Sequence, residues 1–160
     1  MASVSVRLFF RILAIALAFA PSRSFACSPM SNTLAKFEAH NLGEAIIAPD
    51  APLVSVQSIR RGGDRQDSCS DIGRIILLIT PGQAAYAYRF EVITGNSPSG
   101  SFIDKPVVGY DSNGKHAFQF IWLEPGKAVP LDFKVRVTAY SKSGNKGGFT
   151  TIHILDDGRQ

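Results

Sequence analysis

Short runs of strand-forming residues, divided by turns rich in glycine and proline, are the feature that most constrains this sequence. No amphipathic helical segment lies between these runs. Parallel α/β folds need such helices as crossovers, so the pattern favours an antiparallel, all-β sandwich of two sheets and about seven strands. The runs span residues 53–59, 73–80, 86–93, 102–110, 116–123, 131–140 and 149–155.

The run Leu131–Tyr140 determines its own register. Its odd-numbered residues are apolar, whereas its even-numbered residues include Lys134 and Arg136. Successive side chains of a strand point to opposite faces, so one face is predicted to meet the core and the other the solvent. A shift by one residue would bury both cations, which costs several kcal/mol for each unpaired charge.

The run Gly73–Thr80 is apolar on both faces, as is typical of a central strand. Ile75, Leu77 and Ile79 share one face, and Arg74, Ile76 and Leu78 share the other. Only one face of a strand meets the core of a two-layer sandwich, so the second apolar face needs a cover. Either an N-terminal arm, Ser31–Ile47, covers Ile76 and Leu78, or these two residues form a protein-binding patch. The arm itself is expected to be a short helix or irregular.

The N-terminus has the organisation of a secretory signal peptide. Two arginines precede the uninterrupted apolar stretch Ile12–Ala20, and small residues at Ser24 and Ala26 suit signal peptidase. This stretch is much shorter than the roughly 20 residues of a membrane-spanning helix. The sequence therefore predicts export to the periplasm or the medium, with cleavage after Ala26. A mitochondrial presequence is the alternative, because no acidic residue precedes Glu38.

Removal of this leader changes the charge balance. The whole chain has a net charge of +4, but three of its 17 Lys and Arg residues precede the cleavage site, so the mature part has +1. So small a charge gives no reason to expect binding to nucleic acid or to an anionic membrane. We expect a leader (1–26), an arm (27–48) and one β-domain (49–160), without a transmembrane segment in the mature chain.

Cys27 and Cys69 are the two cysteines of the chain. In an oxidising compartment an even number favours a disulfide, which for a loop of this length contributes about 4 kcal/mol in the chain-entropy account. The bridge would tie the arm to the domain. The alternative is a lipid anchor, because Cys27 would become the first residue after cleavage, although residues 24–26 differ from the Leu-Ala-Gly of lipoprotein signals.

A proline–glycine turn and the strand after it carry a further motif. Leu123–Gly126 forms the turn, Phe133–Ala139 alternates as Phe-x-Val-x-Val-x-Ala, and Ser143-Gly144 follows. This order resembles the fibronectin type III family. Ala48–Leu53 is similar to the start of its first strand, and Tyr88–Val92 to its third. The resemblance covers about residues 49–155 and implies an immunoglobulin-like sandwich without a catalytic set.

Residues with reactive or metal-binding side chains form no recognisable site. His40, His116 and His153 lack the spacing of metal ligands. Asp111–Gly114 begins like a calcium-binding loop, but Trp122 stands where that loop needs a bidentate glutamate, so a hairpin turn is preferred. Likewise Arg60–Gln66 is expected to be a flexible surface loop. No cofactor is expected.

The function expected from these features is binding of an as yet unidentified protein outside the cytoplasm, without catalysis. The sheet edges at 102–110 and 149–155, and the loops 60–66 and 141–148, are candidate contacts. Two alternatives remain. One is an envelope lipoprotein anchored through Cys27, and the other is an enzyme whose site combines His116 and His153 with Asp111 or Glu124.

Overall fold

The computed structural model describes residues 34–40, 47–62, 71–124 and 129–158. Within these ranges it contains nine strands and no helix, so no described helix is long and apolar enough to cross a membrane. The strands are β1 (Ala35–Lys36), β2 (Leu53–Arg60), β3 (Ile72–Thr80), β4 (Ala87–Asn96), β5 (Val107–Val108), β6 (Tyr110–Ser112), β7 (Lys115–Leu123), β8 (Leu131–Tyr140) and β9 (Lys146–Asp156).

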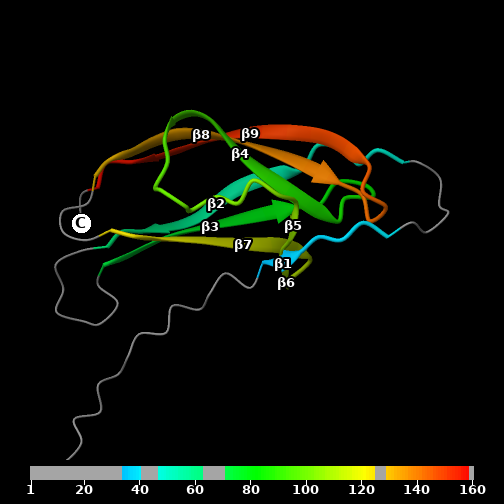
Figure 1. Cartoon of the computed structure of the whole chain (residues 1–160), viewed down its shortest axis with the longest axis horizontal. Coiled ribbons are helices and arrows are strands. Elements are labelled where there is room, and N and C mark those ends of the chain that lie inside the picture. The colour runs from blue at the N-terminus through cyan, green and yellow to red at the C-terminus, as the bar shows by residue number, and fades with distance from the viewer. Residues whose placement is uncertain (1–33, 41–46, 63–70, 125–128, 159–160) are drawn as a thin grey trace, which may run out of the picture.

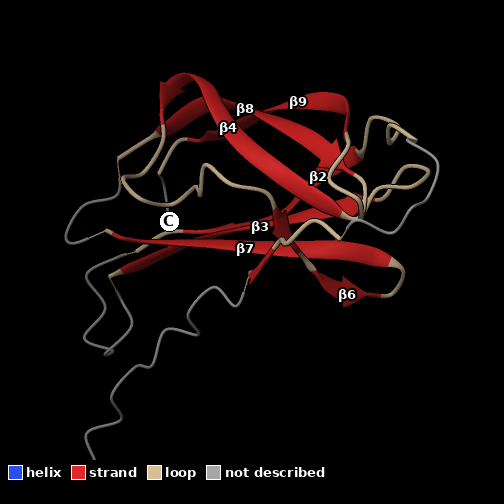
Figure 2. Ribbon diagram, turned by 45° about the vertical axis from the view of Figure 1, so that its right-hand side comes forward, coloured by secondary structure: helices blue, strands red, loops and turns tan. Residues whose placement is uncertain are grey.

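The strands form two antiparallel sheets that lie face to face (Figures 1 and 2). One sheet has five strands in the order β1-β5-β4-β8-β9, and the other has four in the order β2-β3-β7-β6. The prediction of an all-β fold with two antiparallel layers is confirmed. The central position of β3, between β2 and β7, is confirmed as well.

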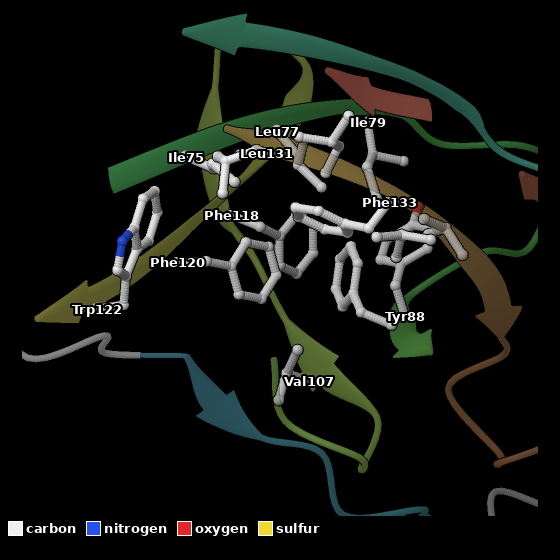
Figure 3. Packing of buried hydrophobic residues seen from close by; sticks show 14 of the residues in the cluster. Ile75, Leu77, Ile79, Tyr88, Val107, Phe118, Phe120, Trp122, Leu131 and Phe133 are labelled. Atoms are coloured by element: carbon white, nitrogen blue, oxygen red, sulfur yellow. The ribbon is translucent and has the colours of Figure 1, made fainter. Parts of the chain in front are cut away.

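The core lies between the sheets and is rich in aromatic rings (Figure 3). The ring centroid of Phe90 lies 4.9 Å from those of both Phe118 and Phe120, and Tyr88 meets Phe118 edge-on at 5.5 Å. Aliphatic side chains from β3, β8 and β9 surround these rings. Each large side chain that is fully buried contributes about 1.5–3 kcal/mol through removal of apolar surface from water.

The register predicted for Leu131–Tyr140 is confirmed, and one of the two apolar faces of Gly73–Thr80 meets the core, as expected. Ile75, Leu77 and Ile79 of β3 are fully buried, as are Val135, Val137 and Ala139 of β8. Thr138 differs from expectation, because it lies on the outward side of β8 yet is buried. It stands between Arg89 of β4 and Phe149 of β9, and these large side chains cover it.

The run 102–110 departs from its prediction as one edge strand. It divides into β5 and the start of β6, and β5 lies between β1 and β4 instead of at an edge. Pro106 has no backbone N–H, so the chain cannot join the sheet as a regular strand before Val107. β6 does form the edge of the four-stranded sheet, and a turn with positive φ at Asn113 and Gly114 leads from it into β7. The predicted hairpin is therefore present.

The described part of the arm, Leu34–His40, extends the five-stranded sheet. Ala35 and Lys36 pair with Val108 and Val107 of β5. Leu34 packs against the core, the ring of Phe37 lies 6.2 Å from that of Tyr86, and the His40 N–H donates to the carbonyl of Lys142 at 3.2 Å. The described arm contains a short strand where a helix or irregular chain was expected.

Candidate functional site

About half of the outward side chains of the four-stranded sheet are apolar, and we call this surface the apolar face. Its uncharged polar members are Ser55, Ser58, Thr80, Ser112 and Gln119. Strand alternation and the pairing of β2, β3, β7 and β6 place these residues on one side of the sheet. Its apolar members are Leu53, Ile72, Ile76, Leu78, Tyr110, Ala117, Ile121 and Leu123. The residues predicted to form an interaction patch, Ile76 and Leu78, lie at its centre.

Several members of the apolar face are open to solvent. Leu123 is 74% exposed, Leu53 73% and Tyr110 51%, whereas Ile76 and Leu78 are half-buried between their neighbours on β2 and β7. The described arm residues pair with the other sheet, so they do not supply the cover that was one hypothesis for this side of β3. The binding-patch hypothesis therefore keeps its geometric basis.

The outward side of the five-stranded sheet has a different chemistry. Arg89 pairs with Asp104 at 2.6 Å, Arg136 with Glu91 at 3.5 Å, and His153 with Asp132 at 2.7 Å. The guanidinium of Arg136 also lies 5.1 Å from the ring centroid of Phe149. Charge on this side is mixed in sign and forms three pairs, which is typical of a solvated surface. The Nε of Arg136 is nevertheless buried without a hydrogen-bond partner among the described residues.

The charged side chains of the apolar face are all cationic: Arg60, Arg74 and Lys115. Arg60 and Arg74 are direct partners across β2 and β3. Like charges in that position repel each other. The Nε of Arg74 is also buried without a hydrogen-bond partner in the described part of the chain. The face therefore combines apolar area with positive charge that the described residues leave uncompensated.

A buried ion network lies at one end of the sandwich, where β2, β7 and β9 end. Arg61 is 8% exposed and Glu124 9%. The Arg61 guanidinium donates to both oxygens of Glu124, to the carbonyl oxygen of Val129, and to Asp156 at 2.7 Å. The backbone N–H of Gly62 donates to Glu124 at 2.8 Å. Residues from both sheets are thus joined through one guanidinium.

The charges of this network are stabilised by each other. Burial acts to lower the pKa of Arg61, but its hydrogen bonds to Glu124 and Asp156 outweigh burial and raise that pKa. Burial acts to raise the pKa of Glu124, but the bonds from Arg61 and from the Gly62 N–H lower it overall. This carboxylate and guanidinium connect the strands, and because they are paired neither of the two is free to act as a general acid or base.

The sequence prediction of a flexible loop at Arg60–Gln66 is wrong for Arg61, which is buried. The signal that locates it is the strand alternation, continued one residue past the ends of β2 and β7 and to the last residue of β9. Ile59, Trp122 and Ile154 point inward, so the residues two positions later also point inward. Those residues are Arg61, Glu124 and Asp156.

The two histidines of the enzyme alternative are not brought together. His116 points inward, with its ring centroid 5.7 Å from that of Tyr88, whereas His153 pairs with Asp132 on the outside of the other sheet. Burial raises the pKa of Tyr88 to about 12, so this phenol is neutral. Glu124 lies eight residues from His116, about 26 Å at the rise of a strand, and is paired with Arg61.

His116 and Asp111 are partners across β7 and β6, and these are the two members of the enzyme set that share a location. Asp111 accepts a hydrogen bond from the Gly114 N–H at 3.4 Å within the hairpin turn. Within the described ranges no group of three or more His, Cys, Asp or Glu could hold a metal ion. The local role of Asp111 is therefore that of a turn residue.

Comparisons with known proteins add no family to this description. No family model matches the chain, no curated protein matches it, and no solved structure does so.

Some of the remaining predicted features lie outside the described residues, and one lies at a sheet edge. Cys27, Cys69 and the leader lie outside the described residues. The predicted edge strand 149–155 lies in β9, which is the edge of the five-stranded sheet. The segment before β2 covers its first half, because the Gly148 N–H donates to the Pro49 carbonyl at 2.8 Å and the Thr150 hydroxyl donates to the Pro52 carbonyl at 2.5 Å.

Proposed function

We propose that this chain is an exported, immunoglobulin-like module that binds another protein through its apolar face and has no catalytic role. The single observation that carries this proposal is the difference between the two outer sides of the sandwich. The five-stranded side has ion pairs of both signs beside the exposed Phe149 and Leu155. The four-stranded side has Ile76 and Leu78 adjacent at its centre, and its charged side chains are all cationic. Leu53, Tyr110 and Leu123, at its margins, are more than half exposed. Covering such a surface with a partner removes apolar area from water.

The strand order supports the immunoglobulin-like part of the proposal. The orders β2-β3-β7-β6 and β4-β8-β9 correspond to A-B-E-D and C-F-G of immunoglobulin constant-type sandwiches. β5 lies beside β4, where an added C′ strand lies in related domains. Phe133 occupies the place of the tyrosine in the fibronectin type III motif and is buried, so its apolar role in the core is kept without the hydroxyl.

The position of the tryptophan supports the same assignment in a modified form. Fibronectin type III domains have a core tryptophan on their second strand, which in this chain is β3. Here Trp122 comes from the neighbouring strand β7 and lies over Gly73 of β3. The indole thus occupies the space that a side chain at Gly73 would need.

Export is supported by the leader-like N-terminus and by the even number of cysteines. Absence of a catalytic role is supported by the scatter of the histidines and by the pairing of Glu124 with Arg61. Binding modules of this architecture use sheet faces, edges or loops, and the apolar face is the surface here whose chemistry most favours a partner.

The test is a double substitution, Ile76→Asp with Leu78→Asp, in the exported protein. We expect the variant to stay folded, as judged by circular dichroism and thermal melting, and to lose a partner that the unchanged protein captures by crosslinking in its native compartment. A matched control is Thr94→Asp with Thr151→Asp, which adds the same charge to the five-stranded sheet and should keep the partner. Collapse of the fold in the double variant, or unchanged capture, would contradict the proposal.

A further inference from the structure

We propose that the partner surface carries carboxylates set among apolar side chains, and that Arg60 and Arg74 bind those carboxylates. This inference rests on the proposed function and specifies the chemistry of the partner. Its basis is the pair of guanidinium groups in the apolar face, which the described residues do not neutralise.

Among the described residues, the nearby acids bind other groups or lie on the other side of the sheet, and Asp64 and Asp67 lie outside the described ranges. Glu124 and Asp156 both bind Arg61, at the end of the sandwich that is nearest to Arg74. Asp71 precedes Ile72 and, by strand alternation, does not point to the apolar face. Among the outward side chains of the four strands there is no carboxylate.

The two arginines are unfavourable as they stand. Their positions are directly opposite each other, where like charges destabilise a sheet. Arg74 is half-buried, its partner across β7 is the apolar Ile121, and its Nε has no acceptor among the described residues. A buried donor without an acceptor destabilises a folded protein, whereas a carboxylate in the same place would accept two hydrogen bonds from one guanidinium.

The apolar surroundings strengthen that interaction. Exclusion of water by Ile72, Ile76 and Ile121 would lower the local dielectric, and an ion pair is stronger in a low dielectric. Arginines ringed by apolar contacts are among the residues that most often dominate protein–protein binding. Arginine also suits this role better than lysine, since its planar fork matches a carboxylate.

The sign of the charge decides between possible partners. A second copy placed face to face would bring together two surfaces of the same charge without a carboxylate on either, so self-association through this face is disfavoured. A nucleic acid would supply phosphates, but its backbone offers no apolar surface to cover Ile76, Leu78 and Leu123. A protein surface that alternates apolar residues with Asp or Glu satisfies both parts of the face.

The experiment uses two blocked peptides with the exported, cleaved protein. One is Ac-Leu-Glu-Leu-Glu-Leu-NH2, and its neutral counterpart has glutamine in place of glutamate. Titration is followed by amide NMR shifts. We expect both peptides to shift signals of β2, β3 and β7, and the acidic peptide to bind at least about tenfold more tightly. An acidic peptide that leaves these signals unmoved at millimolar concentration would overturn the inference.

Substitution separates this inference from the proposed function. Arg60→Gln with Arg74→Gln should abolish the preference for the acidic peptide and leave weak binding of the neutral one. The control Lys134→Gln with Lys146→Gln removes two charges from the other sheet and should keep the preference. Suppose that the unchanged protein binds both peptides equally and that the double variant Ile76→Asp, Leu78→Asp binds neither. This result would refute the role of the arginines, but it would leave the proposed function standing.

Binding of a nucleic acid is the other result that would contradict the inference. A single-stranded oligonucleotide that binds more tightly than the acidic peptide, and loses that binding in the Arg60→Gln, Arg74→Gln variant, would overturn the inference as well. The same double substitution should leave the melting temperature unchanged or raise it, because it removes a repulsion within the fold.

Discussion

Trp122 lies over Gly73, its partner across β7 and β3, so closely that a Cβ built on Gly73 would lie 2.1 Å from Cε2 of the indole. Figure 3 shows the indole at one end of the row of buried rings. The glycine at this point of an otherwise apolar strand is thus explained by the side chain that covers it.

We therefore expect Gly73→Ala to destabilise the fold by about 1–3 kcal/mol, because the indole must shift within a packed core. Urea denaturation of the purified protein measures this change in the free energy of unfolding. In a Trp122→Leu background the same substitution should cost less, since the smaller side chain leaves room for a methyl group. Strictly additive effects of the two substitutions would show that the close approach does not matter.

The network of Arg61 predicts a loss of stability in acid. The pKa of Glu124 is lowered from its ordinary value of 4.5, so its ionised form stabilises the fold. This contribution is complete above the pKa of the unfolded chain and disappears as pH falls through the lower pKa of the folded state. We expect the free energy of unfolding, measured in urea, to fall steeply below about pH 4.

Glu124→Gln should remove that part of the pH dependence. It should also destabilise the protein at pH 7 by about 3–5 kcal/mol, because the buried Arg61 would lose its principal counter-charge. Glu38→Gln, at an exposed carboxylate of the arm, is the matched control and should change neither quantity. An unchanged acid transition in Glu124→Gln would assign that transition to other carboxylates.

The intact mass of the purified protein distinguishes the two roles predicted for Cys27. A disulfide with Cys69 makes the intact chain lighter by two hydrogen atoms than its reduced form, whereas a diacylglycerol anchor makes it heavier by a lipid. We expect the first result, and a loss of about 4 kcal/mol of stability when both cysteines are changed to serine. A lipid adduct on Cys27 would instead establish the membrane-anchored alternative.

The arm should protect an edge of the five-stranded sheet. Removal of residues 27–40 would expose the strand edge of β5 and uncover Tyr86, which packs against Phe37. We expect faster hydrogen exchange at Val107 and Val108, and increased self-association in size-exclusion chromatography, because open edges pair with other chains. Phe37→Ala is a milder version and should leave β1 paired. If exchange at β5 is unchanged after the deletion, the arm has no protective role.

Strand alternation predicts the long strand β8 well, but it does not predict the short strands β1 and β5. In β8 every second residue is apolar, and its predicted ends agree with the structure. β1 has only two residues and pairs with a strand far along the chain, so no local pattern marks it. The division of 102–110 depends on which neighbours β5 finds, which the residues themselves do not specify.

For the candidate site, too, the sequence predicts the features that depend on one strand and not those that depend on distant segments. Ile76 and Leu78 were recognisable because one strand had two apolar faces, and that property is visible locally. The network of Arg61 was missed because Glu124 and Asp156 lie 63 and 95 residues away. Each of these charges is unremarkable in its own segment, and only the closing of the sandwich brings them into one buried group.

The pairing of β1 with β5 also has a consequence for the order in which the molecule is completed. Ala35 emerges early in synthesis, but its partner Val108 follows more than 70 residues later. The first strand must therefore wait, unpaired, until most of the domain exists, and contacts of such long range slow folding. β1 is therefore synthesised before the rest of the domain but is among the last strands to pair, and the five-stranded sheet stays incomplete until β5 has been made.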